Sequence, residues 1–219
     1  MNAAEFFNRE VSLPKPRMGE WAFAIAKTLL GCFLLGVIAK TVLPTHPLLA
    51  GWVGMIGVVF MLHFGLFHLL SLAWRRAGIN AEPVMQNPLL AKSLADFWGG
   101  RWNTAFNELA FRFTFRPLRR WTTPTVATLA VFGLSGIIHE LVISLPAHGG
   151  YGLPTLYFLA QGLGVITERS RWGRKLGLGR GVRGWGFTLL VTAGPVFWLF
   201  HPPFINHVIL PMLTAIGAT

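Results

Sequence analysis

Six apolar runs dominate this chain, and they constrain its fold more than any other feature. The runs are Trp21–Leu43, Leu48–Trp74, Val126–Leu145, Leu153–Thr167, Trp185–Phe200 and Phe204–Gly217. A helix needs about 20 apolar residues to cross a bilayer core, and the first three runs reach that length. Only 12% of the 219 residues are charged, and the mean hydropathy is +0.54. We therefore expect an all-α integral membrane protein with about six transmembrane helices, forming one domain over residues 1–219.

The basic residues gather in three segments outside the apolar runs. All but Lys27 and Lys40 of the 19 Lys and Arg residues precede the first run, separate the second from the third, or separate the fourth from the fifth. The loops that would lie on the other side of the membrane, at residues 44–47, 146–152 and 201–203, contain no Lys or Arg. Because cytoplasmic loops are enriched in these residues, the pattern predicts that both termini are cytoplasmic. The small size suits a bacterial inner membrane, or the endoplasmic reticulum for a eukaryotic source.

The formal charge of +11 could also suggest nucleic acid. No nucleic-acid-binding motif accompanies it, so we expect the partners to be the lipid bilayer and small molecules, not nucleic acid. The sequence does not indicate an oligomeric state.

The segment between Arg75 and Trp121 predicts amphipathic helices that lie in the cytoplasmic interface. Apolar residues recur there at i, i+3, i+4 and i+7, and charged residues recur every fourth position on another face. These residues are Phe106, Leu109, Ala110 and Phe113, and Glu108, Arg112 and Arg116. The arginines could bind substrate phosphates, or they could serve only to anchor the helix to lipid.

His139 and Glu140 form an ionisable pair deep within the third run. His139 lies about 20 Å along a helix that starts at Val126. Burial favours its neutral imidazole, which could accept a proton as a general base. Ser135 could orient the ring, and Gly136 would leave room beside it for a ligand. Glu140 points about 100° away and could pair with an arginine or another helix. The alternative is that His139 only forms a hydrogen bond between helices.

Metal sites are weakly indicated. His139 and Glu140 begin like a zinc-protease motif, but position 143 is Ile instead of a second histidine. His63 and His68 are five residues apart, so they face different directions on a helix. We therefore expect no metal, and we expect His63, His68, His201 and His207 to be polar packing or cavity-lining residues.

Two motifs follow one another along the chain. The first is Asn87-Pro-Leu-Leu-Ala-Lys-Ser-Leu-Ala-Asp-Phe-Trp-Gly-Gly-Arg-Trp-Asn103, and the second is Phe132-Gly-Leu-Ser-Gly-Ile-Ile-His-Glu140. An aromatic stretch ending in Trp-Asn, followed by a membrane histidine in a Ser-Gly-x-x-His-Glu setting, resembles the membrane-bound O-acyltransferase family. The likeness is to its wax synthase branch, the long-chain-alcohol O-fatty-acyltransferases. It covers about residues 87–168, somewhat over a third of the chain. Better-known members are longer, with more spans, and some carry bulkier residues at Gly99–Gly100.

The resemblance implies transfer of an acyl group from acyl-CoA, as co-substrate, to a hydroxyl, with no resident cofactor. His139 would be the catalytic base, and Asn103 would supply an amide N–H to the thioester carbonyl or hold a substrate. The other predicted substrate contacts are Trp98, Arg101, Trp102, Arg112, Arg116, Ser135 and Glu140. The aromatic residues could instead form only an interfacial belt.

Two alternatives to wax-ester synthesis stay open. The acceptor could be the hydroxyl of a sterol, glycerolipid, metabolite or polysaccharide, which the sequence does not distinguish. The chain could also be a non-catalytic membrane transport or assembly protein. That alternative predicts that His139 tolerates substitution and that no thioester is consumed.

Overall fold

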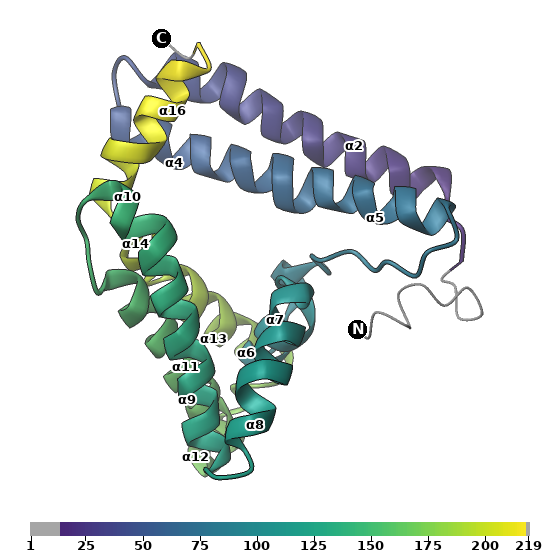
Figure 1. The fold of residues 1–219 in the computed structure, drawn as a ribbon, viewed down its shortest axis with the longest axis vertical. Coiled ribbons are helices and arrows are strands. Elements are labelled where there is room, and N and C mark those ends of the chain that lie inside the picture. The colour runs from purple at the N-terminus through teal and green to yellow at the C-terminus, as the bar shows by residue number, and fades with distance from the viewer. Residues whose placement is uncertain (1–13, 218–219) are drawn as a thin grey trace. The chain divides into compact units, whose positions relative to one another are not determined.

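The structure is a computed structural model that describes residues 14–217, and every regular element in that range is helical (Figure 1). The predicted all-α class is confirmed. The chain divides into two compact units. Unit 1 comprises Met1–Met85 with Ile209–Thr219, and unit 2 comprises Gln86–Val208. Both chain ends and Arg9, which the charge pattern assigns to the cytoplasm, lie outside the described residues.

Unit 1 is built around two long helices joined by a short turn at Pro44 (Figure 1). Its elements are α2 (Met18–Phe33), the π-helical η2 (Leu34–Ala39), α3 (Lys40–Val42), α4 (Pro47–Val58), the π-helical η3 (Val59–Leu66), α5 (Phe67–Arg76) and α16 (Leu210–Ala215). Glycines allow these helices to approach closely, because a Cβ on Gly57 would come within 2.8 Å of Leu35 and one on Gly54 within 3.0 Å of Leu213. These two glycines of the second apolar run therefore serve helix packing.

Unit 2 contains both sequence motifs. Its elements up to the second motif are η4 (Pro88–Leu90), α6 (Leu94–Asp96), the π-helical η5 (Phe97–Arg101), α7 (Thr104–Ala110), the π-helical η6 (Phe111–Phe115), α8 (Arg116–Leu118), α9 (Pro124–His139) and the π-helical η7 (Glu140–Ser144). The elements that follow are α10 (Leu145–Ala147), α11 (Leu153–Arg169), α12 (Arg171–Leu176), α13 (Gly181–Ala193), α14 (Val196–Leu199), α15 (Pro202–Phe204) and η8 (Ile205–Ile209), which leads out of the unit. Helix α11 packs along α9, and the buried core between them includes Phe132 and Phe158.

Three helices of the described chain are long and apolar enough to cross a membrane. They are Met18–Val42, Pro47–Arg76 and Pro124–Ala147, and they cover the first three apolar runs. Gly181–Leu199 and Pro202–Ala215 form a bent pair that would be a fourth span if it crosses as one. Helix α11 covers the fourth run and has 17 residues. The structure thus supports a membrane protein with three or four spans, and the count of six stays a prediction.

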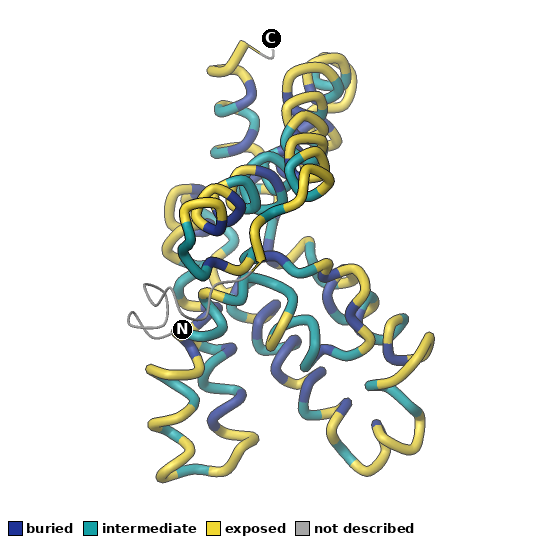
Figure 2. The backbone as a smooth tube through the Cα atoms, turned by 90° about the vertical axis from the view of Figure 1, so that its right-hand side faces the viewer, coloured by how far each residue is buried: buried dark blue, intermediate teal, exposed yellow. Residues whose placement is uncertain are grey.

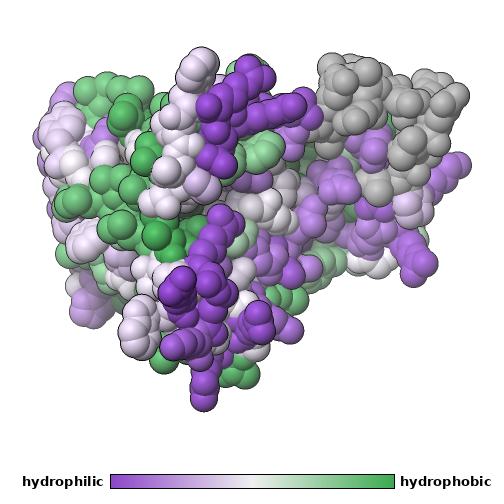
Figure 3. Space-filling model, turned by 90° about the horizontal axis from the view of Figure 1, so that it is seen from below, coloured by the Kyte–Doolittle hydropathy of each residue, from purple (hydrophilic) through white to green (hydrophobic). Residues whose placement is uncertain are grey.

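Large apolar side chains lie open on the surface, as expected for a protein in lipid. Exposed residues recur along the helices as well as in the loops (Figure 2). In the space-filling view, apolar surface adjoins strongly hydrophilic surface (Figure 3). The predicted amphipathic segment is helical from Thr104 to Leu118, with Leu109 and Phe113 exposed. Its helical conformation is confirmed, and its position at a membrane interface stays a prediction.

Candidate functional site

Helix α11 is the scaffold of the candidate site, because it contacts both motifs. A Cβ on Gly136 of α9 would lie 2.7 Å from Cα of Thr155, and one on Gly162 of α11 would lie 3.1 Å from Cδ2 of Phe132. The space beside Gly136 is therefore filled by α11. The expectation that Gly136 leaves room for a ligand was wrong, since the missing side chain lets two helices pack against each other.

The imidazole of His139 is held in one orientation. Its Nδ1 lies 2.6 Å from the main-chain carbonyl oxygen of Ser135. A carbonyl oxygen only accepts hydrogen bonds, so Nδ1 carries the proton and Nε2 of the neutral ring has the free lone pair. No residue of the described chain bonds to Nε2. Ser135 does orient the ring, through its carbonyl and not its hydroxyl, which donates to Val131 O at 3.1 Å.

Aromatic side chains connect His139 to the first motif. The His139 ring lies 4.3 Å from that of Phe158, and Phe158 lies 5.8 Å from Trp98, between ring centroids. Trp98 also meets Phe132 at 5.9 Å. The indole Nε1 of Trp98 donates to Oε1 of the fully buried Gln161 at 3.3 Å. We call these five residues the His139 cluster; it joins the Trp-Asn motif to the membrane histidine.

Gln161 and Phe158 were missed by the sequence reasoning. Both lie on α11, outside the two motifs, and an apolar helix with one glutamine offered no signal stronger than packing. Gln161 also donates from Nε2 to Val191 O at 2.8 Å, so it ties η5 to α13 through α11. A buried amide with both ends bonded specifies one arrangement of its neighbours.

Trp102 and Arg101 support the first motif from within. The Trp102 ring stacks on Phe97 with centroids 5.6 Å apart. Arg101 Nε donates to Asp96 Oδ2 at 2.7 Å, and Nη1 donates to the carbonyls of Gln86 and Asn87. These contacts hold the segment in shape. Whether Trp98, Arg101 and Trp102 also contact a substrate, as the resemblance implies, stays a prediction.

Asn103 begins helix α7 in a left-handed conformation, with φ of 46°. Its Oδ1 accepts the Phe106 N–H at 3.2 Å, which is a helix N-cap. Asparagine tolerates this backbone conformation better than most residues. The amide oxygen serves the cap, and Nδ2 is the atom of this side chain that can donate a hydrogen bond to a carbonyl oxygen.

Glu140 anchors α11 beside His139. Its Oε1 accepts from Gly152 N at 3.1 Å, Thr155 N at 3.0 Å and Thr155 Oγ1 at 2.9 Å. A carboxylate at a helix N-terminus is favoured by the orphan N–H groups and the helix dipole. Of the two partners expected for Glu140, another helix is the one found, and its predicted contact with substrate is untested.

Glu168, at the other end of α11, is a second carboxylate that accepts a backbone N–H at the start of a helix. It is buried, and its Oε2 accepts the Leu94 N–H at 2.6 Å at the start of α6. Burial raises the pKa of this carboxyl, and the backbone hydrogen bonds from Leu94 and Ala95 oppose the rise. The two carboxylates thus join three elements in series: η7 to α11 through Glu140, and α11 to α6 through Glu168.

The remaining predicted residues lie apart from this cluster. Arg112 pairs with Glu108 at 2.5 Å on its own helix, and Arg116 begins α8 with an exposed side chain. Among the described residues, no hydrogen bond or ion pair joins either arginine to the His139 cluster.

Three of the four histidines predicted to be polar packing or cavity-lining residues have hydrogen-bond partners, whereas the buried Nδ1 of His63 has none among the described residues. His68 Nδ1 lies 2.8 Å from Lys27 Nζ, and His207 Nδ1 lies 2.8 Å from Ala147 O. His201 Nδ1 accepts from Phe204 N at 3.2 Å, so its Nε2 carries the proton and donates to Ser144 Oγ at 3.3 Å. His201 therefore cannot activate Ser144 as a base. Residues 14–217 contain no group of three His, Cys, Asp or Glu suited to a metal ion.

Comparison with known proteins bears directly on the two motifs. Residues 81–160 match the family described as membrane bound O-acyl transferase family. The predicted family resemblance is confirmed. The matched segment contains all of the first motif and the second motif with His139, as well as Phe158 on α11.

Several plant proteins are similar to this chain. The chain is 29% identical over 204 residues to the probable long-chain-alcohol O-fatty-acyltransferase 6 of Arabidopsis thaliana, covering 86% of this chain and 57% of that protein. It is 30% identical over 175 residues to the long-chain-alcohol O-fatty-acyltransferase of Simmondsia chinensis, which is 70% of this chain and 48% of that protein. A third relative is the probable long-chain-alcohol O-fatty-acyltransferase 7 of Arabidopsis thaliana. It is 32% identical over 150 residues, which is 59% of this chain and 42% of that protein. The chain thus spans about half the length of these relatives.

Proposed function

We propose that this chain is a membrane O-acyltransferase that moves an acyl group from acyl-CoA to the hydroxyl of a long-chain alcohol. The observation that carries the proposal is the His139 cluster, in which the histidine of the second motif and Trp98 of the first contact the same ring of Phe158. The names of the relatives support the alcohol acceptor. The proposal includes the six-span topology with cytoplasmic termini, which would bring acyl-CoA to the basic segments.

The hydrogen bond of His139 supports its role as general base. An alcohol is a weak nucleophile until its proton is removed, and the Nε2 lone pair is the acceptor that this step needs. The hydroxyl proton passes to Nε2 as the alcohol oxygen attacks the thioester carbon. The tetrahedral intermediate then collapses, the carbon–sulfur bond breaks, and the proton on Nε2 goes to the departing CoA sulfur. The Ser135 carbonyl stabilises the imidazolium between these two transfers.

Asn103 is the proposed donor to the developing oxyanion. Its cap to Phe106 fixes the amide plane, and its Nδ2 would donate to the thioester oxygen. A thiol is a good leaving group, so the reaction needs no strong acid. We keep the predicted substrate contacts of Trp98, Arg101, Trp102 and Ser135 within this proposal.

A direct assay tests this function. Purified protein in micelles is given a panel of acyl-CoAs with hexadecanol, a sterol, a diacylglycerol and water as acceptors, and both free thiol and ester product are measured. We expect stoichiometric release of thiol and formation of a wax ester, with hexadecanol preferred. Transfer mainly to another acceptor would change the substrate class. Absence of thiol release with every acceptor, from a protein shown to be folded, would favour the non-catalytic alternative.

A further inference from the structure

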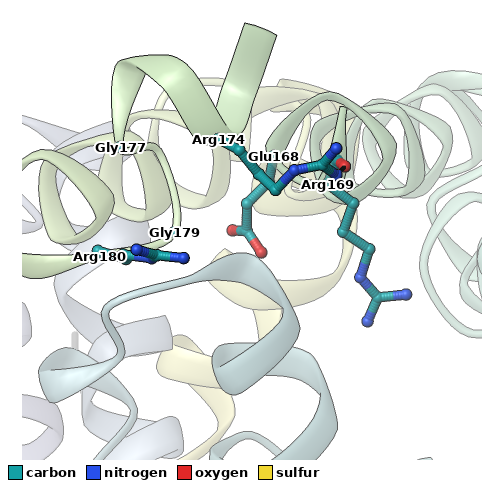
Figure 4. Close-up of a pocket in the computed structure, with 6 residues that line it drawn as sticks. All are labelled: Glu168, Arg169, Arg174, Gly177, Gly179 and Arg180. Carbon is teal, nitrogen blue, oxygen red and sulfur yellow. Dashed lines mark hydrogen bonds between the residues drawn. The ribbon is translucent and has the colours of Figure 1, made fainter. Parts of the chain in front are cut away.

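Two hollows lie on either side of one turn in unit 2. The turn connects α12 to α13 and runs through Arg180 and Gly181. The arginine pocket has a volume of about 180 Å³ and is lined by Glu168, Arg169, Arg174, Gly177, Gly179 and Arg180 (Figure 4). The apolar pocket has a volume of about 520 Å³ and is lined by Leu90, Lys92, Arg101, Gly181, Val182 and Trp185.

The arginine pocket is held in shape by backbone contacts. Gly177 takes a left-handed conformation with φ of 73°, and its carbonyl accepts the Arg180 N–H at 3.1 Å. Gly179 lies against Glu168, since a Cβ there would be 3.4 Å from Cγ of that residue. A side chain at either glycine would disturb the turn or fill the pocket.

The charge of the arginine pocket favours an anion. Three arginines line it against one carboxylate, and that carboxylate is already bonded to the Leu94 N–H. Arg174 donates to the main-chain carbonyl of Arg169, which fixes its guanidinium, and Arg180 extends toward Glu168 (Figure 4). Planar guanidinium groups bind phosphate oxygens well because they can donate two parallel hydrogen bonds.

The apolar pocket suits an aliphatic chain. Val182 is 83% exposed and Leu90 is 62% exposed, so the pocket opens outward. The Trp185 ring is fixed by its Nε1, which donates to Leu89 O at 2.8 Å. Lys92 adds positive charge to the lining, and Arg101 completes it while its own charge is paired with Asp96; the other lining residues carry no charge.

The two pockets are neighbours, because Arg180 lines one and the next residue, Gly181, lines the other. A Cβ on Gly184 would collide with the Lys92 carbonyl, so the start of α13 packs tightly against the first motif. A ligand that carries a phosphate close to a hydrocarbon chain could fill both pockets at once.

We infer that the turn between α12 and α13, together with Arg174 at the end of α12, binds a phosphorylated amphiphile. Its phosphate would lie in the arginine pocket and its chain in the apolar pocket. An anionic phospholipid carries its phosphate close to its acyl chains. In acyl-CoA the pantetheine arm separates the phosphates from the acyl chain, so that arm would be the chain that enters the apolar pocket. For acyl-CoA the inference rests on the proposed function and assigns its phosphates to this turn, not to Arg112 and Arg116.

Binding without turnover tests the inference. The probes are S-hexadecyl-coenzyme A, a thioether that cannot transfer its chain, and dioleoylphosphatidylglycerol, with dioleoylphosphatidylcholine as the zwitterionic comparison. Binding of each to the full chain in micelles is followed by native mass spectrometry. The pocket variant is Arg174→Gln with Arg180→Gln, and the matched control is Arg171→Gln with Arg183→Gln, which removes the same charge from exposed neighbours outside the pocket lining.

We expect the pocket variant to lower the affinity for at least one of the two anionic probes by about tenfold or more. The control variant should lower that affinity by less than about threefold. Loss confined to the thioether identifies acyl-CoA as the ligand, and loss confined to phosphatidylglycerol identifies lipid. Val182→Asp should also weaken that probe, while Leu176→Asp, at an exposed position outside both pockets, should not. Equal losses in pocket and control variants, or no loss in either, would overturn the inference. A protein that binds the thioether through this turn but transfers no acyl group would contradict the proposed function and leave this inference standing.

Discussion

The imidazole of His139 lies against the phenyl ring of Phe158, with 4.3 Å between the ring centroids. Phe158 in turn contacts Trp98, so one residue of α11 sets the position of both motif residues. The hydrogen bond to Ser135 fixes only one edge of the imidazole, so the ring of Phe158, tilted by 42° to it, is the second contact that restricts its rotation.

Phe158→Leu should therefore impair catalysis more than folding. Leucine keeps most of the buried volume but removes the aromatic ring that packs beside the imidazole, and we expect kcat to fall about tenfold with KM little changed. Steady-state transfer to hexadecanol measures both constants. Leu163→Ala, on an exposed face of the same helix, is the control and should retain wild-type kcat. A Phe158→Leu enzyme with unchanged kcat would refute this positioning role.

Substitutions of Asn103 can separate the role of its amide oxygen, which accepts the cap hydrogen bond, from the role of its amide nitrogen, the proposed donor. Asn103→Asp keeps an oxygen that accepts the Phe106 N–H but removes the amide donor, whereas Asn103→Ala removes both. We expect the Asp variant to keep the wild-type Tm and to lose activity by about 10²-fold, and the Ala variant to lose about 1 kcal/mol of stability as well. Thermal unfolding and transfer rate are measured together. Full activity in the Asp variant would show that Asn103 is only a helix cap.

Glu140 should contribute to stability through α11. Removing its three hydrogen bonds in Glu140→Ala leaves N–H groups of the helix start without an acceptor, which costs about 1–3 kcal/mol in the free energy of unfolding. Glu140→Gln keeps an acceptor oxygen and should cost less. Denaturant unfolding in micelles provides the comparison. If Glu140→Ala were as stable as the wild type and lost only substrate affinity, the predicted substrate contact would be its main role.

The buried carboxyl of Glu168 should make the stability of the folded protein depend on pH. Its folded-state pKa is raised above 4.5 by burial, so the folded protein binds this proton more tightly than the unfolded chain does. Stability from this group is present at low pH and is lost as the pH rises from about 4.5 through the raised pKa. Glu168→Gln cannot ionise, so it should lose less stability than the wild type over that interval. Tm measured for both proteins from pH 4.5 to 7.5 checks this, and parallel curves would contradict it.

The sequence predicted the all-helical class and the first three long apolar helices, because the hydrophobic pattern acts locally. The helix breaks at Pro44 and near Pro146 appear where proline interrupts the apolar runs. The contact between the two motifs could not be predicted, because it passes through Phe158 and Gln161, whose roles depend on how α11 packs between other helices. Glu140 was recognised as significant, but its partners lie 12 and 15 residues away, beyond a turn whose path no local pattern specifies. Gly136 was misassigned for the same reason, since the sequence alone does not identify its neighbour Thr155.

One measurement tests the central claim most directly: the transfer rate of His139→Gln compared with the wild type, alongside binding of S-hexadecyl-coenzyme A to both. Glutamine keeps a polar side chain that can donate a hydrogen bond, but its amide is not a base. The account predicts that kcat falls by about 10²–10⁴-fold while the thioether binds with unchanged affinity. Wild-type kcat in the His139→Gln protein would contradict it.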